Sequence, residues 1–152
     1  MREVVEYDLN FRKKGKDGIK KLRVDFISKF VVDTWQLVIS DMQKVQTLSD
    51  ERMSLYQANI DNITKQLENY KEVNKENKKR IKEIEEEIIA IGEKLLDRRF
   101  NIIQIILEDN NVDDEDLKSV EFWSRCVEPD VEIDFINAVV YKDFGKKKAG
   151  IK

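Results

Sequence analysis

The residue types that most often carry chemistry are scarce in this chain. It contains no histidine and a single cysteine, Cys126. An ordinary zinc site needs several Cys or His ligands, and a Ser-His-Asp triad needs an imidazole base, so neither can be assembled. Carboxylates are plentiful, but they fall at helix-surface spacing or at caps, with no pair in an apolar context. We therefore expect no catalytic residue, no metal site and no cofactor, and predict that the protein is not an enzyme.

The other chemistry-bearing groups have simple structural interpretations. The basic turn Lys13–Lys21 is either a solvated tip or a phosphate-binding patch, and the solvated tip is favoured. Cys126 follows Trp123 closely and is more simply a small packing residue than a nucleophile. The chain has 28 basic and 31 acidic residues and a net charge of −3. Such a balance indicates solvated helix faces and not a surface for polyanions.

A long heptad pattern runs from about Asp50 to Leu107, and the helices that it predicts organise the rest of the chain. Apolar residues recur there at alternating spacings of three and four, without proline and with Gly92 as the one glycine. This pattern is typical of a coiled coil. The predicted seam residues are Tyr56, Ile60, Ile63, Leu67, Tyr70, Ile81, Ile84, Ile88, Ile91 and Leu95.

Asn74 and Asn77 interrupt this seam. Because two adjacent polar layers cost stability in a straight coiled coil, we predict that the chain turns over Val73–Lys79 and folds into an antiparallel helical hairpin. A straight helix would be about 90 Å long and would leave too few residues at each end for a separate core. A long dimeric or trimeric helix is the alternative. The predicted layers pair Tyr70 with Ile81, Leu67 with Ile84, Ile63 with Ile88, Ile60 with Ile91, and Tyr56 with Leu95.

The segment before the coiled coil predicts a β-hairpin and one helix. Alternating residues in Val4–Phe11 and Ile19–Phe26 indicate two strands, with a turn signal at Asp17–Gly18. Ser28 is expected to cap a helix over Lys29–Thr47. A break or kink is expected just after that helix, at residues 48–50.

The segment after the coiled coil predicts short helices. Asp113 or Asp114 is expected to cap a helix that ends at Cys126, and Pro129 to begin a last helix that ends at Phe144. The preceding apolar run Ile102–Leu107 is either a domain core or an oligomer contact. The candidate partner-binding residues, each of which could instead belong to the core, are Ile102, Ile103, Ile106, Phe122, Trp123 and Phe135.

Together these elements predict a mainly α fold with a small N-terminal β-hairpin (α+β), in which a helical domain carries a projecting antiparallel helical hairpin. Residues 1–48 and 96–144 are expected to form one compact domain, with the coiled coil inserted at residues 49–95. Residues 145–152 are expected to be a disordered basic tail. No apolar run approaches the roughly 20 residues of a membrane span, and we expect neither a secretory leader nor a membrane partner.

Several segments of this sequence resemble segments of one known family in order and character. They are Phe26–Asp41 (FISKFVVDTWQLVISD), Phe100–Asn111 (FNIIQIILEDNN), Glu121-Phe122-Trp123, Asp134-Phe135-Ile136 and Lys142-Asp143-Phe144. In them the chain resembles the tail assembly chaperones of siphophages and myophages that infect Gram-positive bacteria. The coiled coil departs from the usual short family member and resembles an insertion.

The resemblance implies a non-catalytic protein of the host cytoplasm that is absent from the mature virion. Its implied partners are the tape measure protein, which it would keep soluble, and the tail tube protein, with self-association also expected. One alternative is a coiled-coil structural or adaptor protein of a phage particle or another assembly. A second alternative is a nucleic-acid-binding regulator, but neighbouring acidic residues offset the basic ones, so nucleic acid is not the expected partner.

Overall fold

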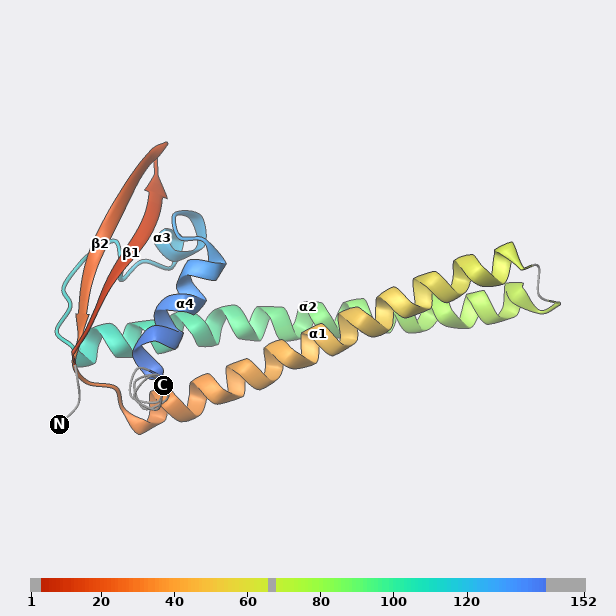
Figure 1. Cartoon of the computed structure of the whole chain (residues 1–152), viewed down its shortest axis with the longest axis horizontal. Coiled ribbons are helices and arrows are strands. Elements are labelled where there is room, and N and C mark those ends of the chain that lie inside the picture. Colours follow the sequence, from red (N-terminus) through yellow and green to blue (C-terminus); the bar gives the residue numbers. More distant parts are fainter. Residues whose placement is uncertain (1–3, 66–67, 142–152) are drawn as a thin grey trace, which may run out of the picture. The chain divides into compact units, whose positions relative to one another are not determined.

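The computed structural model of the chain describes residues 4–65 and 68–141. Within them the elements are β1 (Val5–Lys13), β2 (Lys16–Val24), α1 (Lys29–Thr64), α2 (Tyr70–Asp109), α3 (Val120–Arg125) and α4 (Pro129–Val140) (Figure 1). The two strands pair antiparallel, and the two long helices form a helical hairpin. The structure is therefore mostly helical with an N-terminal β-hairpin, which confirms the predicted fold class.

The chain divides into two compact units. The mixed unit comprises residues 1–36 and 98–152, and the helical hairpin comprises Leu37–Asp97. Both α1 and α2 contribute to each unit. The helical hairpin begins earlier than the predicted boundary at residue 49 and ends near the predicted boundary at residue 95. The predicted basic tail, residues 145–152, and the matched segment at residues 142–144 lie outside the described residues.

A two-residue turn closes the β-hairpin. Lys14 (φ 52°) and Gly15 (φ 78°) both have positive φ. Two successive residues with positive φ are typical of the type I′ turn, whose twist matches that of the paired strands. The predicted turn signal Asp17–Gly18 lies instead inside β2. Gly18 is opposite Phe11 in the strand register, and the Phe11 ring occupies the space that a Cβ at residue 18 would need. The glycine is therefore required by packing and not by a turn.

One face of the β-hairpin joins the core of the mixed unit. Lys20 lies on this same face, and its ammonium group is 5.6 Å from the centre of the Phe11 ring and 2.9 Å from Asp114 Oδ2. Its hydrogen bond to Asp114 raises the pKa of Lys20. A lysine can face the core here because its charge is paired while its stem covers apolar surface. The buried apolar residues of the β-hairpin are Val5, Leu9, Leu22 and Val24.

Helix ends in the mixed unit follow local sequence signals in part. Ser28 Oγ accepts a hydrogen bond from the backbone N–H three residues later, which is the expected cap. Pro129 is the first residue of α4, as expected. The helix expected to begin at Asp113 or Asp114 begins only at Val120. Asp114 instead accepts from the backbone N–H three residues on and closes a turn, which competes with a helix start.

Asn110 connects the end of α2 to the segment after β2. Its Oδ1 accepts from the backbone N–H groups of Asp25 and Phe26, each at 2.9 Å. Its Nδ2 donates to the carbonyl oxygens of Phe26 (2.8 Å) and Ile106 (2.7 Å). Asn111 follows with φ 55°, the left-handed conformation that asparagine tolerates at helix ends.

The helical hairpin turns earlier than predicted. α1 continues through the expected break at residues 48–50 and ends at Thr64, and α2 begins at Tyr70 (Figure 1). The chain therefore reverses direction between Thr64 and Tyr70, and the prediction of a turn over Val73–Lys79 is wrong. Lysine and glutamate, which fill much of that predicted turn, are good helix formers. Its two asparagines also find hydrogen-bond partners between the helices, as described next.

Candidate interaction surface

Each helix of the helical hairpin faces the other through one row of residues, spaced three or four apart except for a step of seven from Val38 to Val45 on α1. The described residues of the predicted seam that lie on α2 are all buried or half-buried. The α1 row differs from the prediction by one residue, since the earlier turn rotates that helix. The α2 row is Tyr70, Asn74, Asn77, Ile81, Ile84, Ile88, Ile91 and Leu95, and the α1 row is Val38, Val45, Leu48, Arg52, Leu55, Asn59 and Asn62.

Four asparagines form a polar layer in this seam near the turn. Asn77 Nδ2 donates to Asn59 Oδ1 at 2.8 Å, and Asn74 Nδ2 donates to the Asn59 carbonyl oxygen at 3.2 Å. Asn62 Nδ2 donates to Asn74 Oδ1 at 3.1 Å. Buried amides are tolerated when they are hydrogen-bonded. The polar residues that led to the prediction of a turn are therefore accommodated inside the seam.

Large apolar side chains of α1 are left on the outside of the helical hairpin. Their exposed fractions run from 46% at Tyr56 to 68% at Met53, whereas Ile84 in the seam is 0% exposed. The predictions that Tyr56, Ile60 and Ile63 lie in the seam are therefore wrong, and Leu67 is outside the described residues. We call the exposed set the apolar row, and it consists of Met53, Tyr56, Ile60 and Ile63.

The apolar row lies on the same face as two further exposed apolar residues of α2. The Tyr56 hydroxyl donates to Glu85 Oε1 at 3.1 Å, which places these outward positions of the two helices side by side. This hydrogen bond also raises the pKa of Tyr56. Ile89 and Leu96 follow Glu85 at four and eleven residues, so they lie on the same side of α2. Both are exposed.

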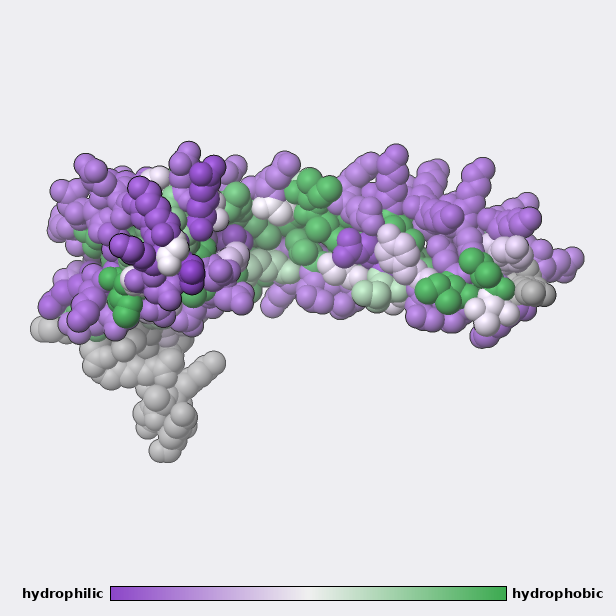
Figure 2. All heavy atoms as spheres, turned by 90° about the horizontal axis from the view of Figure 1, so that it is seen from above, coloured by the Kyte–Doolittle hydropathy of each residue, from purple (hydrophilic) through white to green (hydrophobic). Residues whose placement is uncertain are grey.

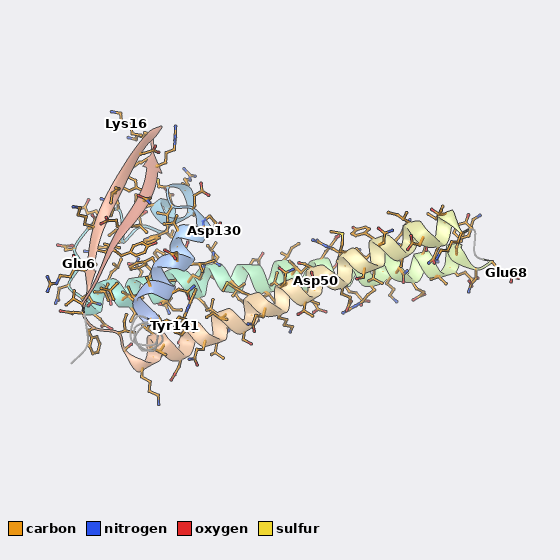
Figure 3. The ribbon with its side chains drawn as sticks, in the orientation of Figure 1. Glu6, Lys16, Asp50, Glu68, Asp130 and Tyr141 are labelled. Carbon is orange, nitrogen blue, oxygen red and sulfur yellow. The ribbon has the colours of Figure 1, made fainter. Side chains whose placement is uncertain are left out.

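The opposite face of the helical hairpin has a different character. Arg80 pairs with Glu51 there, with Nε 2.7 Å from Oε2. Among the described residues, its large exposed apolar side chains are Leu37 and Val73. These two lie at opposite ends of the helical hairpin and form no row. Figure 2, which looks at one side, shows hydrophobic side chains exposed among hydrophilic ones along the helices, and Figure 3 shows side chains pointing outward along both helices, with Asp50 and Glu68 labelled.

The predicted partner-binding residues are elsewhere, inside the mixed unit. All six are buried, with exposed fractions of 5% or less. They could not contact a partner unless this unit opened, so the structure places them in the core, which is the alternative that the sequence left open. The six residues are Ile102, Ile103, Ile106, Phe122, Trp123 and Phe135.

Sequence reasoning missed Met53, Ile89 and Leu96 as surface candidates. A usable signal was present, because each of them follows a seam residue by one position. Such a second three-four row marks a helix that can contact two neighbours. The register of the helical hairpin decides which row is inside, and that register depends on the position of the turn.

One buried ion pair lies in the mixed unit. Arg99 Nε is 3.1 Å from Glu132 Oε1, and both side chains are largely buried. Burial raises the pKa of Glu132, while the charge and hydrogen bond of Arg99 oppose the increase. Over residues 4–65 and 68–141, no group of three or more His, Cys, Asp or Glu side chains is placed to hold a metal ion.

Comparisons with protein-family models, with curated proteins and with solved structures find no match to this chain. In the part of the chain that the structure describes, no helix is both long enough and apolar enough to cross a membrane.

Proposed function

We propose that this protein is a non-catalytic tail assembly chaperone of a phage-infected bacterial cytoplasm. It binds the tape measure protein, keeps that protein soluble and helps to recruit tail tube subunits. The observation that carries the proposal is the apolar row, which is exposed on a helix of the helical hairpin. The resemblance of the carboxyl third to tail assembly chaperones supports the identity of the partner.

The apolar row has the geometry of a helix-binding surface. Met53–Ile63 spans about 15 Å along α1, at 1.5 Å per residue. Apolar anchors at three-four spacing are what an amphipathic helix presents to its partner. A contiguous row of exposed apolar side chains in a soluble protein marks an interaction site. A tape measure protein offers long apolar helices that such a row can cover.

The core of the mixed unit does not take part in this binding. Ile103 and Ile106 are 0% exposed, so a charge at either position would disrupt the fold. The test therefore belongs on the apolar row, where a charged side chain can still reach water.

Co-expression with the tape measure protein tests the proposal. Ile60→Glu places a charge in the apolar row, and Ser54→Glu places the same charge at an exposed position outside it. Burial of an isoleucine contributes about 1.5–3 kcal/mol. At 1.4 kcal/mol per tenfold, Ile60→Glu should weaken binding by about tenfold or more. The tape measure protein should then become insoluble with Ile60→Glu and stay soluble with Ser54→Glu.

Two results would count against the proposal. If the amount of soluble tape measure protein were unchanged with Ile60→Glu, the apolar row would not be the surface that binds it. Stable retention of the protein in purified phage particles would instead support the structural or adaptor function. Equal thermal unfolding of the two variants is the control that both are folded.

A further inference from the structure

Four lysines form a second row on the helical hairpin. Lys71, Lys75, Lys78 and Lys82 follow one another at spacings of four, three and four residues, and all four are exposed. We call them the lysine row. All four residues follow seam residues by one position, as the apolar row does on α1. The row is about 16 Å long, nearly the length of the apolar row.

The two rows share one face. Glu85 continues the lysine row three residues after Lys82, and it accepts the hydrogen bond of Tyr56 from the apolar row. Because α1 and α2 are antiparallel, the lysines run from this contact toward the turn beside Ile60 and Ile63. The face therefore has an apolar edge on α1 and a basic edge on α2.

The lysine row is not neutralised within the structure. None of its four members pairs with a carboxylate in the part of the chain that the structure describes. Arg80, which lies between them in sequence, points to the other face and pairs with Glu51. Among the described residues, Arg80 is therefore paired with a carboxylate and the four members of the lysine row are not.

We infer that this face recognises an amphipathic helix whose apolar stripe is flanked by acidic residues. The apolar stripe covers Met53–Ile63, and the glutamates or aspartates meet the lysine row. The inference rests on the proposed binding function for its biological occupant, and it adds the charge of that occupant. Charge complementarity of this kind selects partners and sets orientation more than it adds affinity.

A second copy of the chain fits the face poorly. Antiparallel pairing of two apolar rows would set Met53 over Ile63 of the other copy and Tyr56 over Ile60. The same pairing would bring the two lysine rows together, and like charges across an interface disfavour it. An acidic helix satisfies both rows at once.

Synthetic peptides test the inference on the full chain. Two peptides of about three heptads carry the same leucine stripe, flanked by glutamate in one and by lysine in the other. Fluorescence anisotropy at low salt should show at least about tenfold tighter binding of the glutamate peptide, and added salt should reduce the difference. Lys75→Glu/Lys78→Glu should reverse the preference. Lys44→Glu/Lys94→Glu makes the same charge change on the opposite face and should leave the preference intact.

Three outcomes would overturn the inference. The first is equal binding of the two peptides, and the second is binding of neither. The third is no peptide preference together with binding to anionic phosphatidylglycerol vesicles that Lys75→Glu/Lys78→Glu abolishes. A failure here with successful co-expression would reject the acidic partner and keep the chaperone function. A failure of co-expression with the predicted peptide preference would keep the acidic-helix site and reject the tape measure protein as its occupant.

Discussion

Asn77 donates its side-chain N–H to Asn59 Oδ1 at 2.8 Å across the helical hairpin. This bond fixes the relative register of α1 and α2 near their turn. Because the asparagines satisfy one another, the seam does not need the neighbouring apolar side chains at this level. In this register the apolar row lies outside the seam.

Substitution at the asparagine pair tests its contribution to stability. Asn77→Leu alone leaves Asn59 Oδ1 without its donor, which should cost about 1–3 kcal/mol in the free energy of unfolding. Asn59→Leu/Asn77→Leu replaces both partners by apolar groups and should recover most of that loss. Urea unfolding of the two single variants and the double variant measures the coupling. Simple additivity of the two single effects would contradict the hydrogen bond.

Two glycines should respond in opposite directions to alanine. At Gly18 a Cβ overlaps the Phe11 ring, which packs 5.3 Å from the Phe122 ring. Gly18→Ala should therefore destabilise the protein by about 1 kcal/mol or more. Gly92 lies inside α2 with open space where a Cβ would be. Gly92→Ala should stabilise the protein by about 0.5–1 kcal/mol, and thermal unfolding of both variants would show whether the signs are reversed.

The buried Arg99–Glu132 pair should show a large effect when one partner is removed. Arg99→Met leaves Glu132 buried and unpaired, which should cost about 3–5 kcal/mol at pH 7. The loss of Arg99 also removes the groups that hold down the pKa of Glu132, so burial should raise that pKa further. Chemical unfolding at several pH values measures the deficit.

The sign of the pH dependence follows from the raised pKa. A carboxyl whose pKa is higher in the folded chain than its unfolded value of 4.5 favours folding when protonated. The deficit of Arg99→Met should be largest above the folded pKa and should shrink as the pH falls toward the unfolded value. Arg99→Met/Glu132→Gln has no such carboxyl, and its deficit should not shrink this way. Parallel pH profiles for the two variants would refute the assignment.

Both tryptophans should report a closed core in the mixed unit. Trp35 and Trp123 are 0% and 3% exposed, and their indole N–H groups donate to Asn137 Oδ1 and to the Leu117 carbonyl oxygen. The native fluorescence should be blue-shifted and little quenched by iodide. Ile60→Glu, which lies in the helical hairpin, should leave this emission unchanged. Strong iodide quenching of the native protein would contradict the assignment of Trp123 to the core.

The residue patterns predicted the strands and helices better than they predicted how α1 and α2 pack against each other. Period-two alternation identified both strands, and Ser28 and Pro129 marked helix starts, because these signals depend on a few neighbouring residues. The position of the turn was predicted wrongly because asparagines such as Asn74 and Asn77 are compatible both with a solvated loop and with a hydrogen-bonded seam. Their amide partners come from the other helix, which no local pattern identifies.

The candidate surface depended on that same turn. Tyr56 and Ile60 were correctly identified as part of an apolar three-four row, but one row cannot reveal whether it faces a helix of the same chain or a partner. In the mixed unit, Trp123 and Phe135 have the residue types of binding anchors and also those of a core. Both are buried because the β-hairpin packs on α4, and this contact joins parts of the chain that are distant in sequence.

Thiol labelling tests most directly whether the apolar row is outside the helical hairpin. In a Cys126→Ser background, Ile60→Cys and Ile84→Cys make the same change at an exposed and at a buried position. Ile60→Cys should react at nearly the rate of the unfolded chain, and Ile84→Cys at least about tenfold more slowly, because it needs local opening. Binding of the tape measure protein should then protect Ile60→Cys. Equal slow labelling of the two cysteines in the free protein would contradict this register and the binding face that follows from it.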